Sequence, residues 1–409
     1  MTAIPLIEIS GADGRERGRS YGEQARRQID AAVDFYAQSF VRTTGLNWQQ
    51  VLERVPAWIP LIEDYLPGIM DEMQGIAEGS GHSLREILAL NGRGELSRPA
   101  VFASMEGEFA DAGSAPTAAT TDKQEEGCSS FAILPEANPF GHVFAGQNWD
   151  WRHETADTVL VLRIVQPDKP TIICQVEAGQ VGRHGANSAG LALNANGIGG
   201  TFGKGLGVPG PFVRRKVLES WTMYDALSAA FRVRQGFNTN LLMTHRDDFA
   251  IDIETTSGRH NWMYPTDGMI VHANHFQAGI PPQIEDSYKP FAVDSLYRVP
   301  KIESGLRRAR SAQNVTEFRA AVRATMSDHF ARPNSVCCHP DPRDHELDRY
   351  STVISSLVDL TSGEYLLTHG LPCENDYQQL PWNIYDGPAE PPDGLVAAES
   401  PVGSAQECS

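Results

Sequence analysis

Apolar residues recur every three or four positions through most of the first hundred residues, and this spacing predicts amphipathic helices. Two such faces stand out, formed by Ile29, Val33, Tyr36 and Phe40, and by Trp48, Val51, Leu52, Val55, Ile59 and Ile62. Ser83 and Glu86 have the spacing of a capping box at the start of a further apolar run. The N-terminal quarter of the chain is therefore expected to be mostly helical.

The pattern changes to short apolar runs after residue 128, and such runs predict β-strands. They are rich in Val, Ile and Leu, are separated by Pro, Gly or Asn, and cover residues 130–134, 143–147, 159–165, 171–177, 191–194, 241–244, 249–255, 269–273, 352–360 and 364–368. Helical spacing returns at residues 211–233, 294–310 and 315–326, with Asn314 and Glu317 as a cap pair for the last helix. Antiparallel strands with helices grouped between them predict a layered α+β fold.

Two segments lack any periodicity. Residues 100–127 are rich in Ala, Gly, Ser and Thr, which predicts a flexible linker that is open to cleavage. Residues 386–409 are rich in Pro, Gly and Ala, which predicts a disordered tail. The expected organisation is a helical segment over residues 1–127, a strand-rich core over 128–385 and the tail.

Composition narrows the class of protein. The chain has 409 residues and a net charge of -18, and it lacks the clusters of Lys and Arg that bind nucleic acid. No apolar run reaches the roughly 20 residues that span a bilayer, and the start lacks the order of a signal peptide. We therefore expect a soluble, cytoplasmic protein without nucleic-acid or membrane partners. Its six cysteines are scattered, which suits buried or reactive thiols better than a disulfide framework.

The stretch EEGCSS places a glycine and a cysteine where the linker meets the first strand. The thiol of Cys128 could attack the carbonyl of Gly127 and form a thioester that water opens, and the absent Cβ of glycine eases the approach of the sulfur. Cleavage would leave an α-amine with a pKa of about 7.7–8.0, which is able to accept the thiol proton. A Gly-Cys pair alone is more often a small buried residue at the start of a strand.

Eight sequence segments, taken together in their order along the chain, favour self-cleavage over this simpler interpretation. They are ILALNGRGEL (87–96), GCSS (127–130), GQNWDW (146–151), EAGQVGRHGANSAGLALNANG (177–197), GVPGPFVRRKVLES (207–220), MIVHANHF (269–276), PNSVCCHP (333–340) and STVISSLVDLTSGEYLLTHGLP (351–372). Together they resemble the acyl-coenzyme A:isopenicillin N acyltransferase family of N-terminal-nucleophile (Ntn) hydrolases. The resemblance implies a four-layer αββα sandwich and self-cleavage into an α chain ending at Gly127 and a β chain beginning with Cys128.

The resemblance also implies roles for individual residues. Asp150 in QNWDW is expected to orient the amine of Cys128, and Asn274 in VHANH is expected to stabilise the oxyanion through its side-chain N–H. Asn194 or Asn196 in NANG would give a second oxyanion or substrate contact, although a turn asparagine is an equally good interpretation.

His272 and His275 flank Asn274 along the sequence. One of them is a candidate to line the substrate pocket, although a histidine whose hydrogen bonds are satisfied within the core is the more frequent case.

One position departs from the family pattern. Where relatives commonly carry an arginine after SxC or SIC, this chain reads SVCCH and has Cys338. A thiol does not replace a fixed positive charge, so the departure argues against a carboxylate-bearing substrate and questions the rate of self-cleavage. Arg343, Arg349 and His339 are the candidates to compensate, and Cys338 itself is expected beside the substrate pocket.

The same region suggests zinc, because Cys337, Cys338 and His339 lie near His329 and His345. Adjacent cysteines seldom share a metal, since tetrahedral sites prefer cysteines separated by two to four residues, so no metal is expected. The glycine-rich stretch over residues 194–210 lacks a GK[ST] sequence, and no GxGxxG precedes a helix. No organic cofactor is expected either.

These features predict an autoprocessed cysteine Ntn amidohydrolase or acyltransferase that acts through an acyl-Cys128 thioester. Its partners would be a small acyl amide or acyl thioester, the α and β chains of one precursor, and a second copy of the chain if it forms a homo-oligomer. Two alternatives remain, an acyl-CoA-dependent N-acyltransferase and an uncleaved, non-catalytic small-molecule binding protein. The sequence leaves the acyl group and the leaving amine open.

Overall fold

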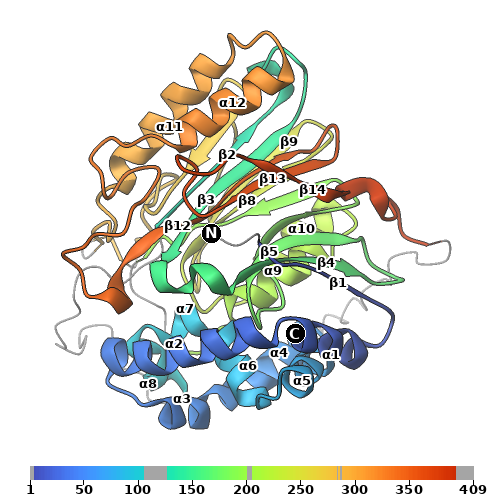
Figure 1. Ribbon diagram of the computed structural model, residues 1–409, viewed down its shortest axis with the longest axis vertical. Coiled ribbons are helices and arrows are strands. Elements are labelled where there is room, and N and C mark those ends of the chain that lie inside the picture. The colour runs from blue at the N-terminus through green and yellow to red at the C-terminus, as the bar shows by residue number, and fades with distance from the viewer. Residues whose placement is uncertain (1–3, 106–126, 200–204, 283, 286–287, 393–409) are drawn as a thin grey trace, which may run out of the picture.

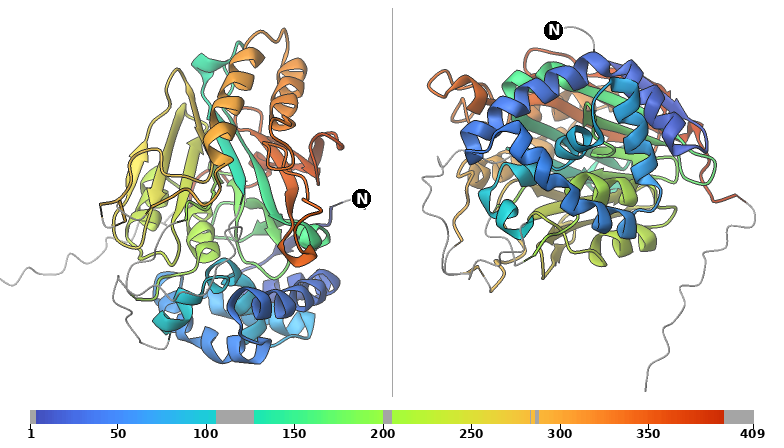
Figure 2. Two further views of the ribbon diagram at one scale, coloured as in Figure 1. Left: turned by 90° about the vertical axis from the view of Figure 1, so that its left-hand side faces the viewer. Right: turned by 90° about the horizontal axis from the view of Figure 1, so that it is seen from below.

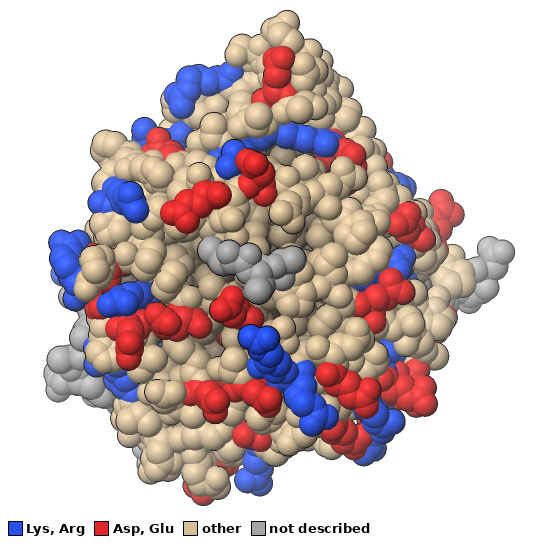
Figure 3. All heavy atoms as spheres, in the orientation of Figure 1, with Lys and Arg blue, Asp and Glu red and all other residues tan. Residues whose placement is uncertain are grey.

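The computed structural model describes residues 4–105, 127–199, 205–282, 284–285 and 288–392. Most of the predicted linker (residues 106–126) and most of the predicted tail (residues 393–409) lie outside the described residues. No helix of the described part is long and apolar enough to cross a membrane. On the face of the molecule in Figure 3, basic side chains are interspersed with acidic ones.

The N-terminal region is helical, as its spacing predicts. Its helices are α1 (Gly14–Gln24), α2 (Arg26–Thr44), α3 (Trp48–Arg54), α4 (Ile59–Tyr65), α5 (Ile69–Ser80), α6 (Leu84–Asn91), α7 (Arg93–Leu96) and α8 (Pro99–Met105). The capping box is confirmed, because Ser83 Oγ accepts from the backbone N–H of Glu86 while the Glu86 carboxylate accepts from the N–H of Ser83. The strand β1 (Leu6–Ser10), which precedes these helices, was not predicted.

Helices α1 and α5 lie unusually close together because glycines line their contact. A Cβ built on Gly18 would lie 1.9 Å from the carbonyl oxygen of Glu72, and one on Gly75 would lie 2.1 Å from that of Arg15. Gly22 and Gly79 repeat the arrangement one turn further along each helix, with closest distances of 2.3 and 2.2 Å. The two backbones therefore touch directly, and no larger side chain fits between them.

The strands form two sheets (Figure 1). The first sheet has the order β1-β4-β5-β6-β7-β8-β9-β10, with β4 (Val159–Val165), β5 (Ile172–Glu177), β6 (His184–Asn187), β7 (Leu191–Asn194), β8 (Thr239–His245), β9 (Phe249–Thr255) and β10 (Asn261–Met263). The second has the order β11-β2-β3-β12-β13-β14, with β2 (Cys128–Ile133), β3 (Phe144–Arg152), β11 (Met269–His272), β12 (Tyr350–Asp359), β13 (Glu364–His369) and β14 (Gln378–Asn383). All pairings are antiparallel except that of β1 with β4, in which Leu6 lies opposite Val161.

Three apolar clusters stack these elements into four layers. Alternate residues of β4 show the principle, because Leu160 and Leu162 pack with the N-terminal helices while Val159 and Val161 pack against the second sheet. The outer face of the second sheet, including Phe131 of β2, packs on α11 (Ser295–Ala309) and α12 (Val315–Met326). The two sheets face each other in the left panel of Figure 2. The predicted αββα sandwich is thus confirmed.

One predicted helix is wrong. The helix expected over residues 211–233 is two helices, α9 (Gly210–Leu218) and α10 (Met223–Phe231). The break has a local cause, because Thr222 adopts an extended conformation and its hydroxyl accepts from the N–H of Asp225 at 3.1 Å. This N-cap begins a new helix in the middle of what looks, by spacing, like a single one.

Candidate active site

Cys128 is the first residue of β2 and is fully buried between the two sheets. It lies opposite Trp149 on β3, so the next residue along β3, Asp150, is its close neighbour. The thiol lies 3.8 Å from the carbonyl oxygen of Asp150. The backbone nitrogen of Cys128, which would become the α-amine after cleavage, donates to Asn274 Oδ1 at 2.9 Å.

Asn274 follows β11 and presents its oxygen to Cys128, because its Oδ1 also accepts from Nη2 of Arg298 at 2.6 Å. A guanidinium only donates, and this fixes which end of the amide faces Cys128. The Nδ2 of Asn274 donates instead to the carbonyl oxygen of Gly197 at 2.8 Å. In the uncleaved chain, Asn274 therefore holds the nitrogen of Cys128.

Arg298 is a residue in contact with Cys128 that the sequence reasoning missed. It is buried on α11, and its Nη1 donates to the carbonyl oxygen of Cys128 at 2.6 Å and to Ser129 Oγ at 2.7 Å. Burial opposes its charge, but Asp294, which accepts from Nε at 2.7 Å, and Asp150 raise its pKa. The guanidinium therefore remains charged beside the nucleophile.

A signal for Arg298 does exist in the sequence. Ser295, Arg298, Val299 and Ile302 recur at the spacing of one helix face, and all four are buried. An arginine among the inward positions of an amphipathic helix requires a buried partner. What the sequence does not show is that Cys128 is that partner.

Asp150 is buried on β3 and accepts from the hydroxyl of Thr352 at 2.6 Å. Burial raises the pKa of its carboxyl to about 8, although Arg298 and Thr352 act in the opposite direction. A Cβ built on Gly127 would lie 3.5 Å from Asp150 Oδ2, so the carboxyl adjoins the Gly127–Cys128 peptide. An ionisable group with a pKa near neutrality thus lies beside the bond that is expected to break.

A β-bulge in β12 gives Asp150 its hydroxyl partner. Ile354 lies opposite Trp149 and Thr352 lies opposite Asp150, so Val353 is an extra residue on that strand. Without the bulge, Val353 would lie opposite Asp150. The bulge therefore places a hydrogen-bond donor, rather than an apolar side chain, at the carboxyl.

Cys338 lies next to this group. Its N–H donates to Thr352 Oγ1 at 3.0 Å and its thiol lies 3.7 Å from the carbonyl oxygen of Tyr350. Burial and the nearby carboxyls of Asp150 and Asp294 raise the pKa of the thiol well above its usual value. Cys338 is therefore a neutral neighbour of Asp150.

The residues proposed to compensate for the absent arginine are engaged elsewhere. Arg343 pairs with the carboxylate of Asp341, Arg349 donates to the carbonyl oxygen of Asp344, and His339 faces His329. The positive charge beside Cys128 is supplied instead by Arg298.

The other predicted site residues are joined to the framework in different ways. Asn196 Nδ2 donates to Ser130 Oγ at 2.8 Å, which links the two sheets, and Asn194 ends β7 opposite Leu242. Nε2 of His272 lies 3.0 Å from Glu254 Oε1, so His272 pairs with a carboxylate of the other sheet.

His275 lies closer to the nucleophile, because its Nδ1 is 2.6 Å from Ser295 Oγ, the same hydroxyl that accepts from the N–H of Asn274. Burial, His272 and Arg298 lower the pKa of His275 to about 4. It is therefore a neutral imidazole that is linked to the backbone N–H of Asn274 through the hydroxyl of Ser295.

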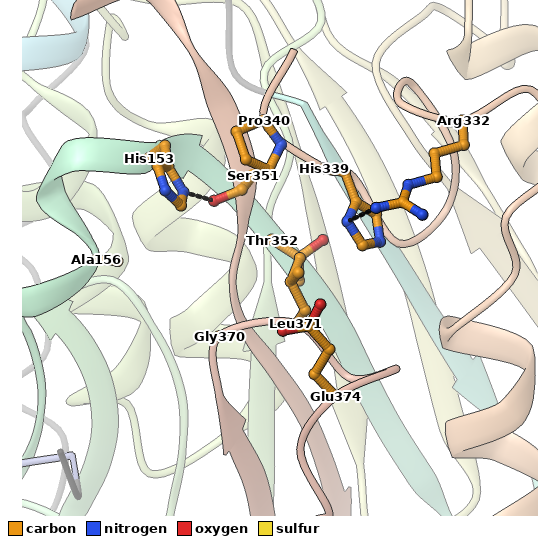
Figure 4. Close-up of a pocket in the computed structure, with 10 residues that line it drawn as sticks. All are labelled: His153, Ala156, Arg332, His339, Pro340, Ser351, Thr352, Gly370, Leu371 and Glu374. Carbon is orange, nitrogen blue, oxygen red and sulfur yellow. Dashed lines mark hydrogen bonds between the residues drawn. The ribbon is translucent and has the colours of Figure 1, made fainter. Parts of the chain in front are cut away.

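A cavity of about 320 Å³ adjoins Thr352, the hydrogen-bond donor of Asp150 (Figure 4). It is lined by His153, Ala156, Arg332, His339, Pro340, Ser351, Thr352, Gly370, Leu371 and Glu374. Cys128 is not among the residues that line the cavity. Thr352 is, and its hydroxyl donates to Asp150. The cavity therefore adjoins Thr352, the hydrogen-bond donor of Asp150, and not Cys128 itself.

Comparison with known proteins gives one family match and several distant relatives. Residues 137–365, more than half of the chain, match the acyl-coenzyme A:6-aminopenicillanic acid acyl-transferase family. The acyl-coenzyme A:6-aminopenicillanic-acid-acyltransferase 40 kDa form of Emericella nidulans is 28% identical over 262 residues, which are 64% of this chain and 66% of that protein, just under two thirds of its length.

Two solved structures have lower similarity. A mutant of the conjugated bile acid hydrolase from Clostridium perfringens aligns with a TM-score of 0.42 and 10% identity, over 63% of this chain and 97% of that one. Penicillin V acylase from Agrobacterium tumefaciens aligns with a TM-score of 0.39 and 14% identity, over 59% and 83%. Similarity at this level carries no conclusion about the reaction.

Proposed function

The chain belongs to the acyl-coenzyme A:6-aminopenicillanic acid acyl-transferase family, and from this premise we propose that it is an autoprocessed cysteine amidohydrolase or acyltransferase. Residues 1–127 form the α chain, and residues 128–385 form the catalytic core of the β chain. The observation that carries the proposal is the meeting of three residues at Cys128: Asn274 accepts from its backbone nitrogen, Arg298 donates to its carbonyl oxygen, and its thiol lies against the backbone carbonyl of Asp150. The matched range begins after the cleavage site, so cleavage rests on this geometry and on the GCSS segment.

Self-cleavage begins when the thiol of Cys128 gives its proton to the carboxylate of Asp150 and the sulfur attacks the carbonyl carbon of Gly127. The C–N bond breaks, the nitrogen of Cys128 takes up the proton held by Asp150, and a thioester joins Gly127 to Cys128. Water then opens the thioester and leaves a carboxylate on Gly127 and a thiol on Cys128. Arg298 and Asn274 support these steps because they fix the carbonyl and the nitrogen of Cys128 while its side chain reacts.

The same residues serve the external substrate. The released α-amine, held by Asn274 Oδ1, accepts the thiol proton, and the thiolate attacks a small acyl amide. Collapse of the tetrahedral intermediate expels the amine and leaves an acyl-Cys128 thioester. The oxyanion role of Asn274 requires its Nδ2 to leave Gly197 after cleavage, and Asn196 and Asn194 remain the proposed second contacts.

The structure favours a substrate that needs no carboxylate recognition at Arg298. The nitrogens of this guanidinium already donate to Cys128, Asn274 and Asp294, so its donors are directed at the protein itself. Hydrolysis of a neutral acyl amide is therefore ranked first. Transfer from an acyl-CoA is the second candidate, because the curated relative is an acyl-coenzyme A acyltransferase.

The test is intact mass spectrometry of the purified chain and of Cys128→Ala, followed by a substrate panel. We expect two polypeptides from the wild type, the second beginning with Cys128, and one uncut polypeptide from Cys128→Ala. A cleaved alanine variant would implicate an external protease, and an uncleaved wild type would favour a non-catalytic binding protein. Acyl amides are then assayed with and without an amine acceptor, and product that requires an acyl-CoA donor would reverse the ranking.

A further inference from the structure

Two histidines and two cysteines meet beside the cavity of Figure 4. His329, Cys337, His339 and Cys373 each direct one ligand atom to a common centre, and these four atoms lie within 4.8 Å of one another. Cys337 is fully buried and His339 is 5% exposed. The set is separate from Cys128, whose thiol lies against Asp150.

The spacing of the four atoms fits a tetrahedral ion. The sulfurs of Cys337 and Cys373 are 3.6 Å apart, and His339 Nε2 lies 3.7 and 3.6 Å from them. The Nε2 atoms of His339 and His329 are 3.1 Å apart. Zinc bonds of about 2.3 Å to sulfur and about 2.0 Å to nitrogen, at tetrahedral angles, require separations of about 3.8, 3.5 and 3.3 Å for the same pairs of atoms.

The remaining two separations, from His329 to the sulfurs, are no longer than 4.8 Å. His329 is exposed in the loop that follows α12, so a shift on the order of 1 Å would complete the shell at little cost. The other three ligands are already in place.

Sequence reasoning rejected zinc because it paired the adjacent cysteines. In the fold these two side chains diverge, since the thiol of Cys338 lies 3.7 Å from the carbonyl oxygen of Tyr350 while that of Cys337 faces Cys373. Cys373 comes from the loop after β13, and the other three ligands come from the loop between α12 and β12. An ion here would join the loop before β12 to the loop after β13, at the end where these two paired strands meet.

We propose that His329, Cys337, His339 and Cys373 bind a structural Zn²⁺ ion. Four protein ligands of the Cys₂His₂ type close the coordination shell, which is the composition of structural rather than catalytic zinc sites. Binding displaces the protons of two thiols, so one ion with two thiolates adds no net charge to a buried region.

The contact between Arg332 and His339 must change when zinc binds. Nη2 of Arg332 lies 3.1 Å from Nδ1 of His339, and a guanidinium only donates, so this contact favours the tautomer with the proton on Nε2. Zinc binding at Nε2 requires the proton on Nδ1, and the exposed Arg332 must therefore withdraw. Glu374 lines the same cavity as His339 (Figure 4), and its carboxylate would be the acceptor for this N–H once Arg332 has withdrawn.

The ion would act on the catalytic group through one strand. Cys338, between the ligands Cys337 and His339, exchanges two hydrogen bonds with Thr352, and Thr352 donates to Asp150. Fixing the ligand loop therefore fixes Thr352 and, through it, the carboxyl of Asp150.

The experiment uses the untagged full-length chain, purified without chelators, and measures zinc by mass spectrometry of the metal. We expect about one zinc per chain, and at least about tenfold weaker zinc binding for Cys337→Ser and Cys373→Ser, measured against a chromophoric chelator. Cys338→Ser is the matched control and should keep its zinc. Arg332→Ala should bind zinc at least as tightly as the wild type.

Two further measurements protect the test against variants that fail to fold. Adding Co²⁺ to the metal-depleted wild type should produce the visible bands of tetrahedral cobalt and a thiolate charge-transfer band. Thiol labelling of the denatured, unreduced chain should find all six cysteines reactive. The proposal is overturned if the wild type holds no zinc after incubation with ZnCl₂, or if Cys338→Ser loses as much zinc as the ligand variants. It is also overturned if two thiols are missing from the count because Cys337 and Cys373 form a disulfide.

Discussion

Arg298 donates to the carbonyl oxygen of Cys128 at 2.6 Å from a helix that begins 167 residues further along the chain than Cys128. The contact brings a fixed positive charge to Cys128, the proposed nucleophile, in a chain that has Cys338 where the resemblance leads us to expect an arginine. The same guanidinium orients Asn274, so one side chain holds both the carbonyl of Cys128 and the amide that holds its nitrogen.

Replacing this guanidinium should stop processing. In Arg298→Met the carbonyl of Cys128 and the Oδ1 of Asn274 lose a buried donor, and we expect self-cleavage to slow by about 100-fold or more. Arg298→Lys keeps the charge but lacks the fork that reaches both oxygens, so an intermediate rate is expected. The rate is followed by intact mass from the time of synthesis. Arg307→Met, on the exposed face of the same helix, is the control, and a normal rate in Arg298→Met would refute the role.

Self-cleavage should accelerate as the pH rises. The carboxyl of Asp150 accepts the thiol proton only when it is ionised, and burial raises its pKa to about 8 in the uncleaved chain. The rate should therefore increase through pH 8 and level off above it, whereas Asp150→Asn should remain uncut at every pH. The measurement is the cleaved fraction of freshly refolded precursor between pH 6 and 9.5. A rate that falls as pH rises would exclude Asp150 as the base.

The same carboxyl predicts a pH dependence of stability in the uncleaved Cys128→Ala variant. Because the folded pKa of Asp150 lies above its ordinary value of 3.8, the folded chain binds the proton more tightly than the unfolded chain. The stabilising contribution of the protonated carboxyl is thus complete below the unfolded pKa and is lost as the pH rises through about 8. Thermal unfolding should show this loss in Cys128→Ala and not in Cys128→Ala/Asp150→Asn. Parallel curves for the two variants would contradict it.

Close contact between α1 and α5 predicts a large effect of one methyl group. Gly75→Ala would place its Cβ 2.1 Å from the carbonyl oxygen of Arg15, and separating the two backbones should cost about 3 kcal/mol of unfolding free energy. Gly94→Ala is the matched control, because nothing lies within 4 Å of its Cβ, and it should leave stability within about 1 kcal/mol of the wild type. Chemical denaturation measures both, and equal stabilities would show that the helices separate without strain.

The two products of cleavage should stay together. Strand β1 of the proposed α chain pairs with β4 of the β chain, and the buried Glu72 of α5 binds Arg215 of α9 at 2.8 Å. We expect both polypeptides to elute as one species from a sizing column in native buffer and to separate only in denaturant. Two native peaks, with an isolated N-terminal fragment, would contradict this expectation.

The spacing of apolar residues correctly predicted the helices and strands that have a clear apolar face of their own. The strands over 159–165 and 191–194 and the helix over 315–326 have the predicted bounds, because each has an apolar face that fits a single layer. It missed β1, β6, β10 and β14, which are short or polar and are defined by the strands beside them. It also joined α9 and α10, because helical spacing continues across the cap at Thr222.

For the site, sequence motifs located the residues whose chemistry is carried by local segments. Cys128, Asp150 and Asn274 do lie together in the fold. Arg298 and Cys373 were not placed, because their roles depend on contacts that only the packing of α11 and the path of the loop after β13 create. For Arg298, the sign in the sequence was a charged side chain among the apolar, inward positions of a helix.

The extra residue in β12 means that the loss of a single residue could change the proposed maturation of this protein. Deleting Thr352 would remove the bulge and would bring the apolar side chain of Val353 opposite Asp150, in the place of the Thr352 hydroxyl. A carboxyl without that donor would ionise even less readily. The rate of the proposed self-cleavage thus depends on the length of one strand. A single-codon deletion far from Cys128 in the gene is expected to leave a folded precursor that cleaves itself slowly.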